Sequence, residues 1–458
     1  MKKRSSLLLM ICLIFSLAAC GSNTNDALAG SEQQTAGDQQ ERSGEELGSF
    51  NKSASLDETV MVDENGVKIT ATGLNYTDHS VDLELSIENS SGKDLSFSSG
   101  TMGYHCNSIN GYMVSDGYLN CDVADGKKAN ETISFSYDAL MLYGIDEIAD
   151  MEIGFTMSDD DYNDTYSGPR QLKTSAFDAH DYGKDHYQET IKSRAAMNTY
   201  GYDMTYFSQD PLYEENGIKL CSSGVMVNQD GRTALLLELE NTTSDMVHMT
   251  TSDIAINGLV ASSVVWSSDT INPGKRCIID VELSEVLNSE YWSVYGIQEV
   301  GSVTLSLSQY DAEGEELASE TPVEIVVPDT AAEHDAAGDE VYHEGGLRIV
   351  AKTVLEDPSG YSSDLHVLLL AENKSGKTLT IDYIGDSLSV NGVMTDAFCE
   401  YKELADGESA VLEILLWGSS LETNQITAAS DVKEVEIGFE IKAGSNDVDD
   451  PTVKITFD

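Results

Sequence analysis

Many segments of the chain alternate apolar and polar residues. Apolar side chains stand at every second position over 81–87, 151–157, 235–239, 303–307, 365–369 and 435–441. Successive side chains of a strand point to opposite faces, so this spacing predicts strands with one buried and one solvated face. Short strands of this kind, separated by turn residues, predict an all-β chain built from antiparallel sheets.

The same landmarks recur three times in one order. Strands end in Glu-Asn at Asn89, Asn241 and Asn373, Asn-Gly pairs follow at Asn110, Asn257 and Asn391, and a proline opens the last strand at Pro169, Pro322 and Pro451. We interpret the strand-end asparagines as turn caps and not as a site. The repeat, on the order of 110 to 130 residues, is too long for a solenoid unit and suits a domain with its own core.

The repeat therefore predicts three tandem immunoglobulin-like antiparallel β-sandwich domains, at 57–177, 212–328 and 341–458. Short helical passages are expected around 139–148 and 284–294. The interval 329–340 is short and acidic, and we expect a simple linker there.

The interval 178–211 belongs to neither neighbouring repeat and is rich in tyrosine. Its aromatic side chains predict a ligand-recognition surface for a protein or a glycan, because aromatic faces stack on sugar rings and peptide side chains. The candidates are Tyr182, Tyr187, Tyr200, Tyr202 and Tyr206. Packing of the same tyrosines against the two flanking domains is the alternative, and it would stiffen the connection.

The N-terminus carries an export signal. A basic start and a short apolar run over 7–17 precede Leu17-Ala18-Ala19-Cys20. This ending resembles the signal of bacterial lipoproteins, which implies removal of residues 1–19 and a diacylglycerol on the Cys20 thiol. Residues 20–56 contain few large apolar side chains, so we expect a lipidated, disordered tether after the signal.

The composition is strongly acidic, with 26 Lys and Arg against 80 Asp and Glu and a formal charge of −54. Such a charge repels nucleic acid and anionic lipid, which excludes a nucleic-acid partner and leaves the lipid as the contact with the membrane. The cysteines lack the spacing of a zinc site. In an exported chain Cys106 could pair with Cys121 and Cys221 with Cys277, and buried thiols are the alternative.

Acidic loops precede the terminal proline of each repeat. The first has Asp159, Asp160, Asp161 and Asp164, the second Asp311, Glu313, Glu315 and Glu316, and the third Asp447, Asp449 and Asp450. Clustered carboxylates supply the oxygen ligands that Ca²⁺ prefers, so calcium is the one cofactor considered and otherwise none is expected. The alternative is a set of solvated loops, because the spacing of an EF-hand is missing.

No sequence motif of a familiar enzyme class is present, and we predict that the chain is not an enzyme. In broad pattern the repeats resemble the immunoglobulin-like, telokin-like domains of bacterial surface lipoproteins. The resemblance implies a lipid-anchored, extracellular protein on the outer face of a Gram-positive cytoplasmic membrane, and it carries no site residues. We expect a non-catalytic binding or scaffold module; an accessory or sensor subunit of a membrane complex is the alternative, and a hydrolase with an unrecognised site is a third.

Overall fold

The computed structural model describes residues 47–100, 107–261, 265–331, 333–358 and 360–457. The predicted signal peptide, Cys20, most of the predicted tether and Cys106 lie outside these residues. The fold is all-β, as predicted: antiparallel sheets face each other across buried apolar side chains, with only short helices between strands. Buried apolar residues form three clusters, one for each repeat, and we call the repeats the first, second and third units.

In the first unit, β1, β2, β3 and β8 form one sheet, and the remaining strands form the sheet that faces it. The elements are β1 (Thr59–Glu64), β2 (Val67–Tyr76), β3 (Ser80–Asn89), β4 (Leu95–Ser99), β5 (Asn107–Ile109), β6 (Tyr112–Val114), β7 (Leu119–Val123), β8 (Lys127–Ser136), α1 (Tyr137–Leu142), β9 (Asp150–Asp159) and β10 (Asp164–Lys173). Helix α1 lies near the start of the expected helical passage.

The connector contains η1 (Phe177–Ala179), α2 (His186–Ile191), α3 (Arg194–Tyr200) and β11 (Tyr202–Ser208). The second unit follows with β12 (Glu214–Glu215), β13 (Ile218–Asn228), β14 (Thr233–Asn241), β15 (Val247–Ile256), β16 (Leu259–Val260), β17 (Ser268–Ile271), β18 (Arg276–Glu282), α4 (Ser284–Leu287), α5 (Glu290–Ser293), β19 (Ser302–Tyr310) and β20 (Glu316–Val326). Strand β11 pairs with β13, so the end of the connector joins a sheet of the second unit.

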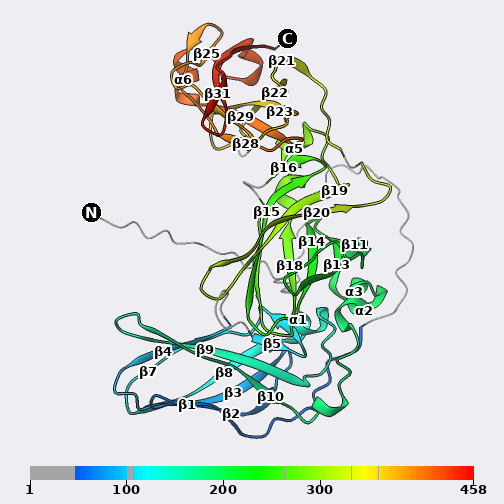
Figure 1. Ribbon diagram of the computed structural model, residues 1–458, viewed down its shortest axis with the longest axis vertical. Helices are drawn as coiled ribbons and strands as arrows, with labels where there is room; N and C mark the ends of the chain where they lie inside the picture. Colours follow the sequence, from blue (N-terminus) through cyan, green and yellow to red (C-terminus); the bar gives the residue numbers. More distant parts are fainter. Residues whose placement is uncertain (1–46, 101–106, 262–264, 332, 359, 458) are drawn as a thin grey trace, which may run out of the picture.

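The third unit contains β21 (Asp339–Glu344), β22 (Leu347–Glu356), β23 (Leu365–Asn373), β24 (Leu379–Tyr383), β25 (Ser389–Val390), β26 (Val393–Met394), β27 (Ala397–Cys399), β28 (Lys402–Leu404), β29 (Ser409–Leu416), α6 (Gly418–Thr423), η2 (Ala429–Asp431), β30 (Glu434–Ala443), β31 (Asn446–Asp449) and β32 (Thr452–Thr456). It lies at the top of Figure 1, above the second unit, while the first unit lies across the bottom.

Two sheets run from one unit into the next. The short strand after the Asn-Gly turn of the first unit, β6, pairs in parallel with the start of β18, which makes one 11-stranded sheet. In the same way β16 of the second unit pairs in parallel with β29 of the third, which makes one 10-stranded sheet. We call these contacts the first joint and the second joint.

The Asn-Gly turns that start these strands use the same bonds in each unit. Asn257 has a positive φ of 51°, and its side-chain oxygen accepts from the backbone nitrogens of Gly301 and Ser302 at 2.8 and 2.9 Å. Asn110 accepts in the same way from the backbone nitrogens of Ala149 and Asp150, where β9 begins. Asn391 accepts from those of Lys433 and Glu434, where β30 begins. Asparagine tolerates this backbone region, so the turn type follows from the sequence.

The structure corrects the predictions for the end of the tether, for the acidic linker and for the terminal prolines. The end of the predicted tether, 47–56, packs on the first unit, where Phe50 stacks on Tyr137 with ring centroids 4.5 Å apart. The predicted acidic linker lies against the second unit, because the Asp335 nitrogen donates to the Tyr295 carbonyl at 2.7 Å.

The terminal prolines are the third correction. Only Pro451 directly precedes the last strand of its unit, whereas Pro169 lies within β10 and Pro322 within β20. Both of these strands lie at the edges of their sheets, where a residue without a backbone N–H is tolerated.

Candidate functional site

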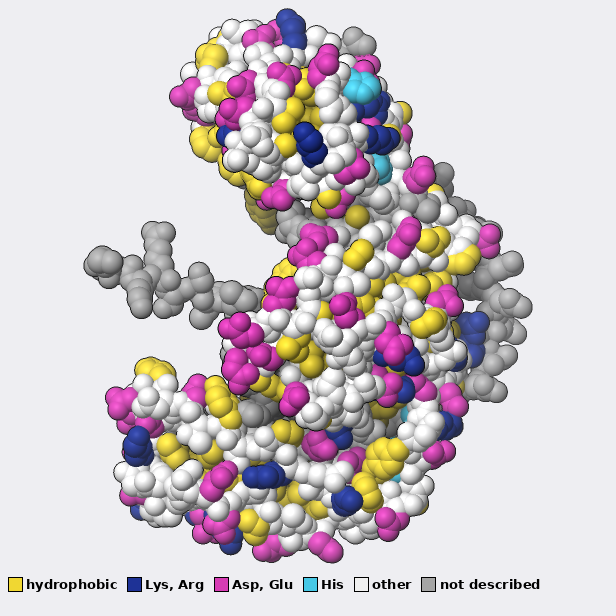
Figure 2. Space-filling view, viewed as in Figure 1, with side chains coloured by type: hydrophobic (Ala, Val, Ile, Leu, Met, Phe, Trp, Pro, Cys, Tyr) yellow, Lys and Arg dark blue, Asp and Glu magenta, His cyan; other side chains and the backbone are white. Residues whose placement is uncertain are grey.

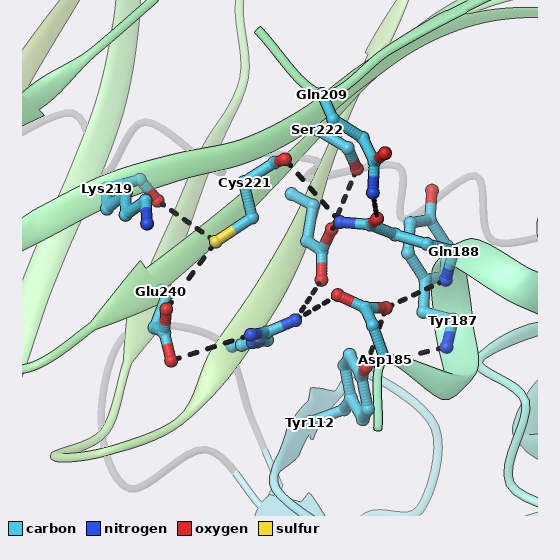
Figure 3. A network of polar contacts seen from close by, with 11 residues as sticks. Tyr112, Asp185, Tyr187, Gln188, Gln209, Lys219, Cys221, Ser222 and Glu240 are labelled. Atoms are coloured by element: carbon cyan, nitrogen blue, oxygen red, sulfur yellow. Dashed lines mark hydrogen bonds and ion pairs between the residues drawn. The ribbon is translucent and has the colours of Figure 1, made fainter. Parts of the chain in front are cut away.

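A polar cluster lies at the first joint and centres on Arg276. The Arg276 backbone nitrogen donates to the carbonyl of Gly111 in the first unit at 2.9 Å. Its guanidinium makes an ion pair with Asp185 of the connector and others with Glu238 and Glu240 of β14, at 3.0 and 3.6 Å. Figure 3 shows this cluster with Tyr112 of the first unit, Asp185 of the connector and Glu240 of the second unit.

Glu238 is the buried centre of the cluster, with a side chain that is 0% exposed. Its other carboxylate oxygen accepts from Gln188 Nε2 at 2.6 Å and from Ser222 Oγ at 2.7 Å. Burial, together with the nearby carboxylate of Asp185, raises the pKa of Glu238 to about 6. The hydrogen bonds and Arg276 oppose this shift, so the carboxylate is charged at neutral pH only because its partners surround it.

The remaining groups orient these charges. The Asp185 carboxylate caps α2 by accepting from the Gln188 nitrogen at 2.9 Å, and it also accepts from the Tyr112 hydroxyl at 3.2 Å. Lys275, next to Arg276, makes a second ion pair across the joint with Glu152 at 2.8 Å. Each of these charged groups is matched by a group of the chain itself, so the cluster binds the first unit, the connector and the second unit together.

The predicted tyrosine surface is wrong for two of its members. Tyr187 and Tyr202 are buried, and the Tyr202 hydroxyl donates to the Ile191 carbonyl at 2.7 Å. Tyr182 is partly exposed but donates to Asp150 at 2.8 Å, and Tyr200 and Tyr206 are half-buried. The alternative interpretation, packing, agrees with the structure: Tyr187 and Ile191 of helix α2 lie in one apolar cluster with Leu236 on the outer face of β14.

The acidic loops do not gather into one site. The Asp159 carboxylate accepts from Lys93 Nζ at 2.6 Å and from the Asn163 nitrogen at 3.0 Å, and these bonds lower its pKa. Asp164 accepts from Ser158 and Asp449 from Tyr342, whereas Asp160, Asp161, Asp447 and Asp450 are exposed. Across the described ranges no three acidic, histidine or cysteine side chains lie close enough together to hold a metal ion.

The predicted pairing of Cys221 with Cys277 is wrong, because no disulfide joins them. Cys277 points into the core, whereas Cys221 lies on the outer face, where its Sγ is 3.6 Å from Glu240. Burial raises the pKa of the Cys221 thiol to about 12. Cys121 is a half-buried thiol on β7, and its predicted partner Cys106 lies outside the described residues.

No local pattern in the sequence marks the members of this cluster, because they lie far apart along the chain: Asp185, Gln188, Glu238 and Arg276. One signal was available. The outward positions of β3 are polar (Asp82, Glu84), whereas those of β14 and β23 include Leu236, Leu368 and Leu370. Nearly continuous apolar strands are buried on both faces, so this difference indicates that the second and third units are covered on the side where the first is open.

No helix in the described part of the chain is long and apolar enough to cross a membrane. No protein-family model and no curated protein matches the chain.

Some solved structures show distant similarity. One comes from work on host cell surface retention of a 1.5-MDa bacterial ice-binding adhesin; it is 12% identical, with 82% of this chain and 90% of that chain covered and a TM-score of 0.13. The YadV chaperone is 9% identical over 49% and 92%, with a TM-score of 0.14. An exo-chitosanase of Amycolatopsis orientalis is 7% identical over 89% and 79%, with a TM-score of 0.17. These scores are too low to support any argument about function.

Proposed function

We propose that the chain is a non-catalytic binding and scaffold protein, anchored outside the cell through a lipid on Cys20, which presents an outer face of its third unit to a protein or glycan. The observation that carries the proposal is the continuity of the two sheets through both joints. Backbone pairing and buried ion pairs at a joint resist bending, so the third unit is held away from the first.

The outer face of the third unit offers two exposed aromatic side chains. Phe398 on β27 is 49% exposed and Trp417, directly after β29, is 45% exposed. Phe398 pairs with Leu415, so Trp417 stands at the diagonal position on the same face. Adjacent aromatic faces stack on sugar rings or on apolar peptide side chains, and they replace the connector tyrosines as the proposed contact.

The strong negative charge determines the class of ligand. The chain carries 80 acidic and 26 basic residues, and Figure 2 shows acidic side chains over all three units. A polyanion would be repelled, so the proposed ligand is a neutral glycan or a protein surface without net negative charge.

The test compares the wild-type chain with a Phe398→Ala, Trp417→Ala variant. Each is mixed with peptidoglycan freed of anionic polymer and, separately, crosslinked on intact cells. Loss of an aromatic hot spot worth about 2 kcal/mol or more should reduce the retained fraction at least tenfold. Tyr162→Ala, which removes a 91% exposed aromatic side chain from the first unit, is the control and should bind as wild type.

Equal retention of all three proteins would contradict the aromatic site. A crosslinked integral membrane protein that is lost only with the double variant would favour the accessory-subunit alternative over glycan binding.

A further inference from the structure

Each joint combines two elements, which we call the hairpin and the receiving strand. The hairpin is the Asn-Gly turn and the two residues after it, which are Tyr112 and Met113 in the first unit and Leu259 and Val260 in the second. The receiving strand follows a turn ending in Gly and is paired at its start, at Arg276 in β18 and at Ser409 in β29. The two joints use the hairpins of the first and second units and the receiving strands of the second and third.

The hairpin of the third unit takes part in neither joint. Its Asn391-Gly392 turn has positive φ values of 53° and 80°, the geometry of the other two Asn-Gly turns. The two residues after it, Val393 and Met394, form β26, which among described strands pairs only with β25. They are 48% and 59% exposed, whereas Tyr112 and Leu259 at the same place in the joints are 5% and 0% exposed.

The receiving strand of the first unit also takes part in neither joint. Strand β8 follows the Asp125-Gly126 turn, so Lys127 corresponds to Lys275 and Lys128 to Arg276. In the described part of the chain β8 pairs only with β3, and it forms the open edge of its sheet. Lys127 and Lys128 are exposed, whereas Ser409, which stands in the place of Lys128 in the second joint, is buried.

The charged residues beside the unused hairpin and the unused receiving strand match the ion pair of the first joint. There Lys275 pairs with Glu152, which stands opposite Ser108 on β5. In the third unit Glu436 stands opposite Ser389 on β25, the same position in the repeat. A copy that docked on this end would bring Lys127 to Glu436, as Lys275 comes to Glu152.

We propose that copies of this chain associate head to tail, with β26 of one copy pairing in parallel with the start of β8 of the next. The 7-stranded sheet of one copy and the 4-stranded sheet of the next would then form one sheet, as at the joints. The two edges lie at opposite ends of the molecule (Figure 1), so the contact is heterologous and extends into chains of copies.

The outer face of the first unit limits the strength of the contact between copies. At the second joint the outer apolar side chains of β22 and β23, such as Leu368 and Leu370, pack into the core of the second unit. The corresponding face of β3 carries Asp82 and Glu84 and adds no apolar burial. The copy contact therefore rests on edge pairing, two apolar side chains and the lysine–glutamate pair, and the association is reversible and dependent on concentration.

Sedimentation velocity on residues 21–458, which include every described residue, tests the proposal over a range of concentrations. The weight-average mass of the wild type should rise with concentration from one chain toward two and more, and the rise should shrink in high salt, which screens the ion pair. Lys127→Glu and Glu436→Lys should each remain monomeric, because each places like charges opposite each other.

An equimolar mixture of the two variants should associate again, because each unlike contact then joins opposite charges. Arg170→Glu, which makes the same charge change at an exposed site on β10, should associate as wild type. Circular dichroism checks that each variant is folded, since Lys127 and Arg170 are exposed and Glu436 is partly buried opposite Lys454. A wild type that stays monomeric at every concentration, or single variants that associate as well as wild type, would overturn the proposal. The aromatic pair is unchanged in these variants, so glycan or protein binding by that pair is tested independently.

Discussion

Single residues in this chain act mainly by satisfying backbone and charge at the ends of strands. Asn89 donates to the carbonyls of Lys93 and Val123, and Asn241 and Asn373 make the equivalent bonds in their units. Their interpretation as turn caps is confirmed. Arg276 is different, because it neutralises carboxylates that the repeat pattern alone does not bring together.

Replacing Arg276 by Leu should lower the free energy of unfolding by about 3 kcal/mol at pH 7, because the buried Glu238 loses its cation. The folded-state pKa of Glu238 is already raised from 4.5 to about 6, so the folded chain binds this proton more tightly than the unfolded chain. Its contribution to stability therefore falls as the pH rises through that window. Without Arg276 the pKa rises further, and the loss should be smaller at pH 5 than at pH 7.

Urea denaturation at the two pH values measures this difference. Arg232→Leu is the control. Arg232 makes an ion pair with Glu282 at 2.9 Å, but the Arg232 side chain is 43% exposed. The control should therefore lower the free energy of unfolding by less than about 1 kcal/mol. An equal loss for Arg276→Leu at pH 5 and pH 7 would show that packing, and not the charge of Glu238, sets the cost.

The elements that determine the architecture are the shortest ones. β6 and β16 contain three and two residues, yet each joins sheets of neighbouring units. Leu259 at the start of β16 is fully buried within the core of the second unit, and β16 pairs with β29 of the third. Tyr295 adds a hydrogen bond across the same joint, from its hydroxyl to the Leu369 carbonyl at 2.9 Å.

Leu259→Asp should lower stability by about 3 kcal/mol or more, because it places a carboxylate in an apolar core without a cation. Scanning calorimetry should show the second and third units unfolding at a lower temperature than in the wild type. Val393→Asp changes the corresponding residue of the third unit, where the side chain is exposed, and should leave the unfolding temperature nearly unchanged. A large effect of Val393→Asp would mean that β26 is covered in the single chain.

At the scale of the whole molecule, the three units form a continuous array, and its two ends differ. One end presents the unpaired edge of β8 in the first unit with its lysines, and the other presents the unused hairpin of the third unit. In the proposed function the lipid on Cys20 fixes one side of this array to the membrane.

Cys20→Ser should abolish lipidation. After detergent phase partitioning the wild type should enter the detergent phase, and mass spectrometry should find diacylglycerol on its N-terminal cysteine. The variant should lack this mass. Cys12→Ser changes the other cysteine of the signal region and should leave lipidation intact. A wild-type chain without a lipid mass would contradict the anchoring.

The sequence by itself determined the all-β class, the strand-end caps and the Asn-Gly turns, because alternation and turn chemistry act between near neighbours. It could not place Asp185 beside Arg276, bury Tyr187 and Tyr202, or separate Cys221 from Cys277. Those outcomes depend on how one unit packs on the next. Only the tertiary structure decided that two hairpins join neighbouring units while a third stays open, because edge pairing between units depends on which strands lie at an edge, and no local pattern encodes that.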